Sequence, residues 1–166
     1  MRSFQKKVMW IIVSFLSLNS YGGNIPDLGT MLGIYKLYKS NPNSVPVKCP
    51  PKIMITERCT FDELHINNPD DPYFVFYKFE HIGRGKVQNF INNKLEYDSL
   101  TTYVETNGSN TITNNSRQYE RKYDEWYTGE IKLTIQEDTL SYIDKFVWDK
   151  SPDKTVINYD CIYKKF

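Results

Sequence analysis

Apolar and polar residues alternate with a period of two along the C-terminal third of the chain, and this pattern constrains the fold most strongly. The segment 130–136 places Ile131, Leu133 and Ile135 on one face. The segment 139–148 continues the alternation after a two-residue acidic turn. Two such segments joined by a tight turn predict a β-hairpin.

Similar patterns recur along the chain, separated by turns rich in Gly, Pro and Asn. The segment 155–163 is the last of them, with Ile157, Tyr159, Cys161 and Tyr163 expected on one face. The earlier segments are 32–39, 52–58, 61–67, 73–82 and 97–106. Strands without intervening helices predict an all-β fold, an antiparallel up-and-down meander of eight or nine strands that closes as a small barrel. A β-sandwich is the alternative.

Composition agrees with a β fold. The chain has 13 Tyr, 9 Phe and 3 Trp and no alanine. Aromatic and β-branched residues favour strands, and the lack of alanine removes the strongest helix former.

Three segments are harder to assign. The segment 116–127 carries tyrosines four residues apart, which fits either a helical face or one face of a strand, and we favour a strand. The segment 87–94 is expected to form a helical turn or a loop. The polar segment 106–116 is expected to be a mobile loop.

The first 22 residues have the order of a secretory signal peptide. A basic head precedes an apolar run at 8–18, which is too short to span a bilayer, and small residues follow it. Cleavage is expected after Ser20 or Gly22. The alternative is a retained amphipathic anchor or a buried N-terminal helix. The signal peptide predicts a secreted or periplasmic protein.

The mature chain, 23–166, is expected to form a single domain. Removal of three of the 21 basic residues and none of the 20 acidic ones leaves 18 against 20, a net charge of about −2. A strongly basic surface is thereby excluded, and with it the usual basis of nucleic-acid binding. The mature chain has no second apolar run of membrane length.

The three cysteines, Cys49, Cys59 and Cys161, suggest one disulfide in an oxidising compartment. Cys49 and Cys59 flank a predicted strand, which would hold them on the order of 30 Å apart, beyond the reach of a disulfide. Cys161 is therefore expected to pair with one of them. In a closed meander the end of the last strand lies near the end of the second, which favours Cys59–Cys161 over Cys49–Cys161.

Motifs for catalysis or for cofactors are weak. The segment 83–86 (GRGK) lacks the spacing of a phosphate-binding loop and is expected to be a glycine turn. His65 and His81 have no evident nucleophile or acid partner in the sequence. The adjacent carboxylates at 70–71 and 124–125 are expected to be solvated rather than a catalytic pair. The sequence thus predicts no enzyme, no cofactor and no metal site.

The segment Gly33-Ile34-Tyr35, on a first strand that follows a turn-like segment, together with Cys161 in the last strand, resembles a small lipocalin-like (calycin) β-barrel protein. Tyr35 stands where lipocalins carry the tryptophan of a Gly-x-Trp motif. The resemblance implies a barrel with a pocket at its mouth and no catalysis.

We therefore expect a non-enzymatic binding protein that holds a small apolar or amphipathic ligand in its barrel. The residues expected to contact this ligand are Tyr35, Phe76, Tyr142, Phe146 and Trp148. The alternative is a protein-interaction module, such as an exported hydrolase inhibitor. It would act on an extracytoplasmic protein through its loops, such as 106–116 or 67–72.

Overall fold

The computed structural model describes residues 28–41, 48–57 and 62–166, apart from the side chains of 72–74. The predicted signal peptide and Cys59 lie outside these residues. The described chain has one short 3-10 helix, η1 (Leu28–Met31), and ten strands. The strands are β1 (Gly33–Ser40), β2 (Lys52–Glu57), β3 (Leu64–Asn68), β4 (Asp71–Phe79), β5 (Lys86–Ile91), β6 (Lys94–Thr106), β7 (Ser109–Glu120), β8 (Glu125–Gln136), β9 (Thr139–Trp148) and β10 (Thr155–Lys165).

The strands form one antiparallel sheet in the order β4-β3-β2-β1-β10-β9-β8-β7-β6-β5. Strands that follow one another in the chain are neighbours, except that β1 pairs with β10 and that β4 and β5 lie at opposite edges. The predicted all-β, up-and-down antiparallel arrangement is confirmed, with ten strands in place of eight or nine. In the described residues the sheet does not close, because no ladder joins β4 to β5.

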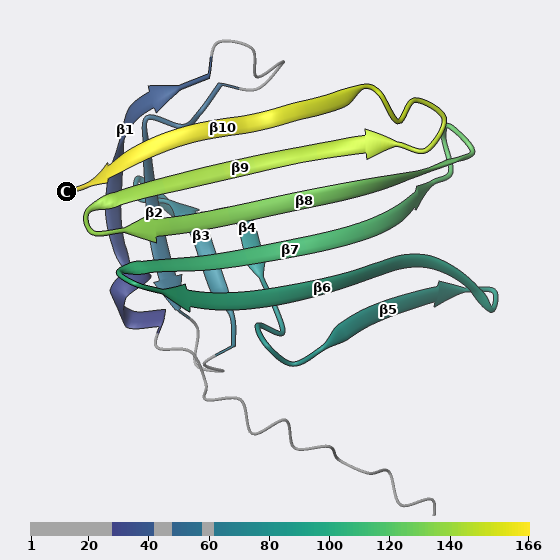
Figure 1. Ribbon diagram of the computed structural model, residues 1–166, viewed down its shortest axis with the longest axis horizontal. Helices are drawn as coiled ribbons and strands as arrows, with labels where there is room; N and C mark the ends of the chain where they lie inside the picture. Colours follow the sequence, from purple (N-terminus) through teal and green to yellow (C-terminus); the bar gives the residue numbers. More distant parts are fainter. Residues whose placement is uncertain (1–27, 42–47, 58–61) are drawn as a thin grey trace, which may run out of the picture.

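The sheet curls so that β1–β4 lie behind one end of β6–β10 and run steeply across them (Figure 1). Strands β1–β3 have only 8, 6 and 5 residues, whereas β6–β10 have 10 to 13. At about 3.3 Å per residue, the short strands cannot cover the full length of the long ones. We call the face of β6–β10 turned toward β1–β4 the inner face.

The hydrophobic core lies between the short strands and the covered end of the inner face. Its fully buried side chains include Tyr35, Ile53, Ile66, Leu133 and Tyr163. The η1 residues Leu28 and Met31 are also buried, and the Tyr35 hydroxyl donates a hydrogen bond to the Met31 carbonyl oxygen at 3.0 Å. The helix thus closes one end of the core.

The three segments that were hard to assign from the sequence consist of strands and turns. The segment 87–94 contains most of β5 and a turn, so the predicted helical turn or loop is wrong. The segment 106–116 is not a loop, because β7 begins at Ser109 after a two-residue turn. Gly108 has a φ of 75°, which glycine adopts without steric cost. The segment 116–127 is extended as favoured, but a turn at 121–124 divides it between β7 and β8.

A β-bulge in β10 breaks the alternation expected there. Ile157 pairs with Lys145 and Tyr159 pairs with Asp144, so Asn158 has no partner across the ladder. Directly opposed residues point to the same side of a sheet. Ile157 therefore lies on the opposite face from Tyr159, contrary to the predicted shared face.

The disulfide joins Cys161 to Cys49, with a Cα–Cα distance of 5.9 Å, so the predicted Cys59–Cys161 pairing is wrong. The reason is the overlap of the outer strands. Only the last residues of β10 pair with β1, and Cys161 lies opposite Ser40 at the end of β1. The first residue of β2, Lys52, pairs with Lys36 of β1, and Cys49, three residues before it, lies alongside the end of β1.

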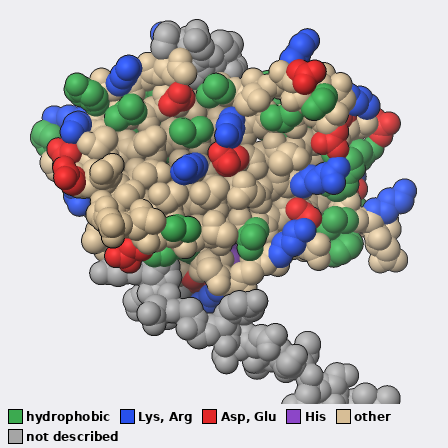
Figure 2. Space-filling view, in the orientation of Figure 1, with side chains coloured by type: hydrophobic (Ala, Val, Ile, Leu, Met, Phe, Trp, Pro, Cys, Tyr) green, Lys and Arg blue, Asp and Glu red, His purple; other side chains and the backbone are tan. Residues whose placement is uncertain are grey.

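The outer face of β6–β10, seen in Figure 2, carries interspersed acidic and basic side chains. Several of them form ion pairs, including Lys145 with Glu130 at 2.9 Å and Arg117 with Asp149 at 2.7 Å. Within the described residues, no helix has the length and hydropathy needed to cross a bilayer.

We expect Cys49→Ser and Cys161→Ser each to lower the free energy of unfolding by about 2–4 kcal/mol, because each opens a link between residues far apart in the chain. The two cysteines are separated by 112 positions. Urea denaturation without reductant measures this loss. The double variant should lose little more than either single variant, since all three lack the same bond.

The matched control is Cys59→Ser, which should retain the disulfide. Peptide mapping without reduction should recover a linked Cys49–Cys161 peptide. Recovery of a Cys59–Cys161 peptide would contradict the structure.

Candidate functional site

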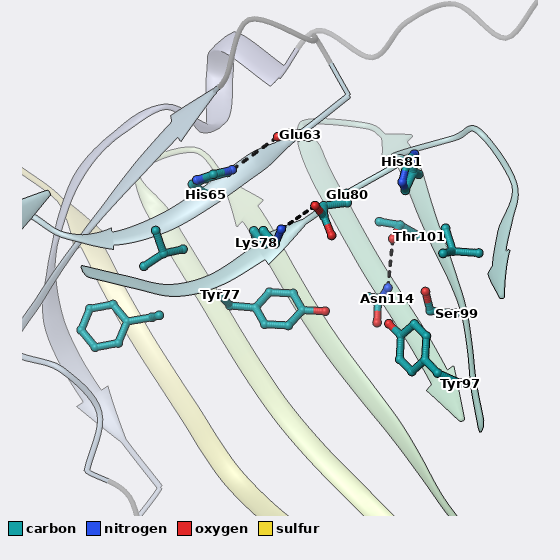
Figure 3. A pocket seen from close by; sticks show the side chains of 13 residues that line it. Glu63, His65, Tyr77, Lys78, Glu80, His81, Tyr97, Ser99, Thr101 and Asn114 are labelled. Atoms are coloured by element: carbon teal, nitrogen blue, oxygen red, sulfur yellow. Dashed lines mark hydrogen bonds and ion pairs between the residues drawn. The ribbon is translucent and has the colours of Figure 1, made fainter. Parts of the chain in front are cut away.

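Two adjoining clefts open where the inner face extends beyond the short strands. The larger cleft has a volume of about 820 Å³ and lies in the gap between the edges, with walls from β3–β7 (Figure 3). The smaller cleft, of about 490 Å³, lies over the far ends of β6–β10. Tyr77, Tyr97 and Asn114 line both, so the two clefts form one continuous site.

The floor of the larger cleft is polar. Ser99 and Thr101 on β6 and Asn114 on β7 are each at least 95% buried, and Asn114 donates a hydrogen bond to the Thr101 hydroxyl at 3.0 Å. Together with Tyr97 we call these residues the polar wall. Buried polar groups require hydrogen-bond partners, and this wall presents several of them to one space.

His65 on β3 lies at the rim of the same cleft (Figure 3). Its side chain is 8% exposed, and its Nε2 atom is 3.6 Å from a Glu63 carboxylate oxygen. This atom is buried without a hydrogen-bond partner. The Glu63 carboxylate is therefore the one polar partner of this atom among the described residues.

The smaller cleft has an aromatic wall, formed by Tyr127 on β8, Phe146 and Trp148 on β9, and Tyr123 in the β7–β8 turn. The ring centroids of Tyr127, Phe146 and Trp148 lie 5.2 to 5.7 Å from one another, with interplanar angles of 61° to 86°. Edge-to-face contacts of this kind are the preferred geometry of aromatic pairs. They hold neighbouring rings as separate surfaces of the cleft.

Gly129 makes room beside this wall. It lies on β8 opposite Phe146 and Ser116 and lines the smaller cleft. A Cβ atom there would lie 3.1 Å from the Ser116 hydroxyl oxygen. The strand thus presents backbone where its neighbours present large side chains.

Asp144 lies on β9 between Tyr142 and Phe146 on the inner face and lines the smaller cleft. Burial raises the pKa of the Asp144 carboxyl, against the opposing effect of a hydrogen bond from Asn158 at 3.4 Å. The β10 bulge is what directs Asn158 toward Asp144. Within the described residues, no Lys or Arg forms an ion pair with this carboxylate.

Tyrosine hydroxyls from several strands surround Asp144. Burial, and after it the Asp144 charge, raises the pKa of Tyr142 and Tyr159. Burial, the neighbouring Tyr97 and Asp144 raise the pKa of Tyr77. These hydroxyls are therefore protonated at neutral pH, and they serve as hydrogen-bond donors and acceptors.

The five residues expected to contact a ligand lie in two places. Tyr35 and Tyr142 belong to the core, and Tyr35 lines neither cleft. Phe76 lines the larger cleft, whereas Phe146 and Trp148 line the smaller one. Tyr142 lines a void of only about 10 Å³, whose other walls include the core residues Ile53, Ile66 and Tyr163.

Sequence reasoning missed the polar wall and Asp144. The signal that was available is the period-two spacing of Tyr97, Ser99 and Thr101, and of Asn114 with its neighbours Ile112 and Ser116. When polar residues follow buried apolar residues on the same face of a strand, that face extends beyond the hydrophobic core.

Within the described residues, no group of three or more His, Cys, Asp or Glu side chains is placed to hold a metal ion. Comparisons with protein families, curated proteins and solved structures found no match to this chain. The lipocalin-like resemblance therefore stays a prediction, and the site is interpreted from its own geometry.

We expect Asp144→Asn to raise the melting temperature by a few degrees at neutral pH. Because the pKa of Asp144 is raised in the folded state, its charged form lowers stability above that pKa. The gain in melting temperature should shrink as the pH falls, because the Asp144 carboxyl of the native chain becomes protonated in both the folded and the unfolded state. Thermal unfolding followed by circular dichroism across pH 3–8 measures it.

The matched control is Asp153→Asn, which changes an exposed carboxylate in the β9–β10 turn. It should shift the melting temperature little at any pH. An Asp144→Asn variant that is less stable than the native chain at neutral pH would contradict the expectation.

Proposed function

We propose that this protein is an exported, non-enzymatic binding protein that holds a small amphipathic ligand on the uncovered part of its inner face. In this proposal the curled sheet acts as a lipocalin-like barrel, and the gap between β4 and β5 acts as its mouth. The ligand would lie at the end of the sheet that the short strands leave open, and not at the centre of the barrel as expected from the sequence.

The observation that carries the proposal is the division of one continuous site into a polar and an aromatic wall. The polar wall lies on β6 and β7, and the aromatic wall lies on β8 and β9. A ligand with one polar and one apolar side would satisfy both. Volumes of about 820 and 490 Å³ are within the usual range of small-molecule sites.

Rigidity supports binding by a preformed site. Most residues of both walls lie on strands paired on both sides, and the rings of the aromatic wall pack against one another. A ligand that enters such a site need not order loops, which lowers the entropic cost of binding.

The chemistry of the site also favours binding over catalysis. The tyrosine hydroxyls near Asp144 have raised pKa values, so they are poor bases at neutral pH. The alternative is an interaction module that acts through its loops. The segment 106–116 does not support it, because most of this segment is strand.

We expect Gly129→Leu to abolish binding of N-phenyl-naphthylamine, a neutral amphipathic fluorophore. A leucine side chain would project from β8 into the smaller cleft, where Gly129 now leaves space. The nearest atom is a serine hydroxyl that can rotate away, so the strand should remain folded. Probe fluorescence and energy transfer from tryptophan, together with circular dichroism, measure both effects.

The control is Thr128→Leu, the same new side chain on the neighbouring residue, which is exposed and points to the outer face. It should bind the fluorophore as the native chain does. If the native protein fails to bind this fluorophore and long-chain alcohols, yet captures a protein from its own extracytoplasmic fraction, the interaction module is the better account.

A further inference from the structure

We propose that the smaller cleft binds the ammonium group of a small organic cation, with Asp144 as its counter-ion and the aromatic wall as the surface on which it packs. This inference rests on the proposed binding function and specifies the chemical class of the ligand.

Asp144 has no cationic partner among the described residues. Its side chain is half-buried, and a carboxylate with restricted access to water is costly unless it is paired. Its one hydrogen bond within the described residues comes from Asn158, at a long distance of 3.4 Å. The adjacent Lys145 does not supply the charge, because its ammonium group pairs with Glu130 at 2.9 Å.

Aromatic rings line the cleft that contains this carboxylate. Tyr127, Phe146 and Trp148 pack against one another at interplanar angles of 61° to 86° and form one wall of the cleft. The face of an aromatic ring attracts a cation, and tryptophan does so most strongly. A cation beside Asp144 can therefore lie against this wall.

The other charged side chains of the smaller cleft favour a cation over an anion. Glu120 also lines this cleft, so its charged side chains are two carboxylates and one lysine that is already paired. An anionic head group would meet repulsion from Asp144. A neutral hydroxyl group would donate a hydrogen bond to Asp144 but would leave the charge of this carboxylate uncompensated. An organic ammonium ion satisfies both the charge and the rings.

The test compares choline with neohexanol, its neutral carbon analogue, by isothermal titration calorimetry on the mature protein. Choline should bind at least about tenfold more tightly, because the Coulombic attraction to Asp144 and the cation–π contacts together exceed ~1.4 kcal/mol. Asp144→Asn should remove this preference, and the exposed-site control Asp153→Asn should preserve it. Equal affinity for the two probes in the native protein would overturn the inference.

Acidification provides a second readout. The tyrosines that face Asp144 are Tyr77 from β4, Tyr127 from β8, Tyr142 from β9 and Tyr159 from β10, and burial raises the pKa of each, so all are neutral at and below neutral pH. Glu120 from β7 is a second carboxylate in this cleft. Choline binding should weaken as the pH falls, and Asp144→Asn should reduce this pH dependence, while neohexanol binding changes little. A choline affinity that is constant down to pH 3 would contradict the role of Asp144.

The source of the cation is distinguished with Nα-acetyl-lysine methylamide, which mimics a lysine in a polypeptide. Binding of this probe more tightly than choline would overturn the assignment to a small free cation. The proposed function is tested separately by N-phenyl-naphthylamine, which carries no positive charge at neutral pH. Binding of the fluorophore without a preference for choline would remove this inference and retain the proposed function.

Discussion

The pairing of β1 with β10 is the interaction on which the rest of the structure depends. It joins strands β1–β4 to strands β5–β10, of which β6–β10 are the long ones. The Cys49–Cys161 disulfide links the chain just before β2 to β10 across β1. Without this seam the short strands would have no fixed position over the inner face, and the core around Tyr35 and Tyr163 would lose one of its layers.

The difference in strand length then divides the inner face into a core and an open cleft. Where β1–β4 cover the long strands, the inner face is apolar and almost free of voids. Beyond them the same strands carry polar residues, aromatic rings and Asp144. Partial contact with water makes this composition tolerable, because an unpaired carboxylate in a closed core would cost several kcal/mol.

The sequence predicted the parts of the fold that depend on local alternation. Ile131, Leu133 and Phe146 were placed on the correct face because their strands are regular. The cysteine pairing was not predictable, because it depends on how far β10 extends past β1, which no local pattern encodes. Asn114 was missed for a different reason, since a buried polar residue in a polar segment gives no hydrophobic signal.

The bulge in β10 makes the surroundings of Asp144 depend on a single inserted residue. Asn158 is the one residue added between Ile157 and Tyr159, so its deletion would leave a regular ladder with every other side chain on its present face. The cleft would keep its walls, yet Asp144 would lose the one donor that the described residues offer it. Loss of one codon at this point would therefore change the surroundings of Asp144 without refolding the sheet around it.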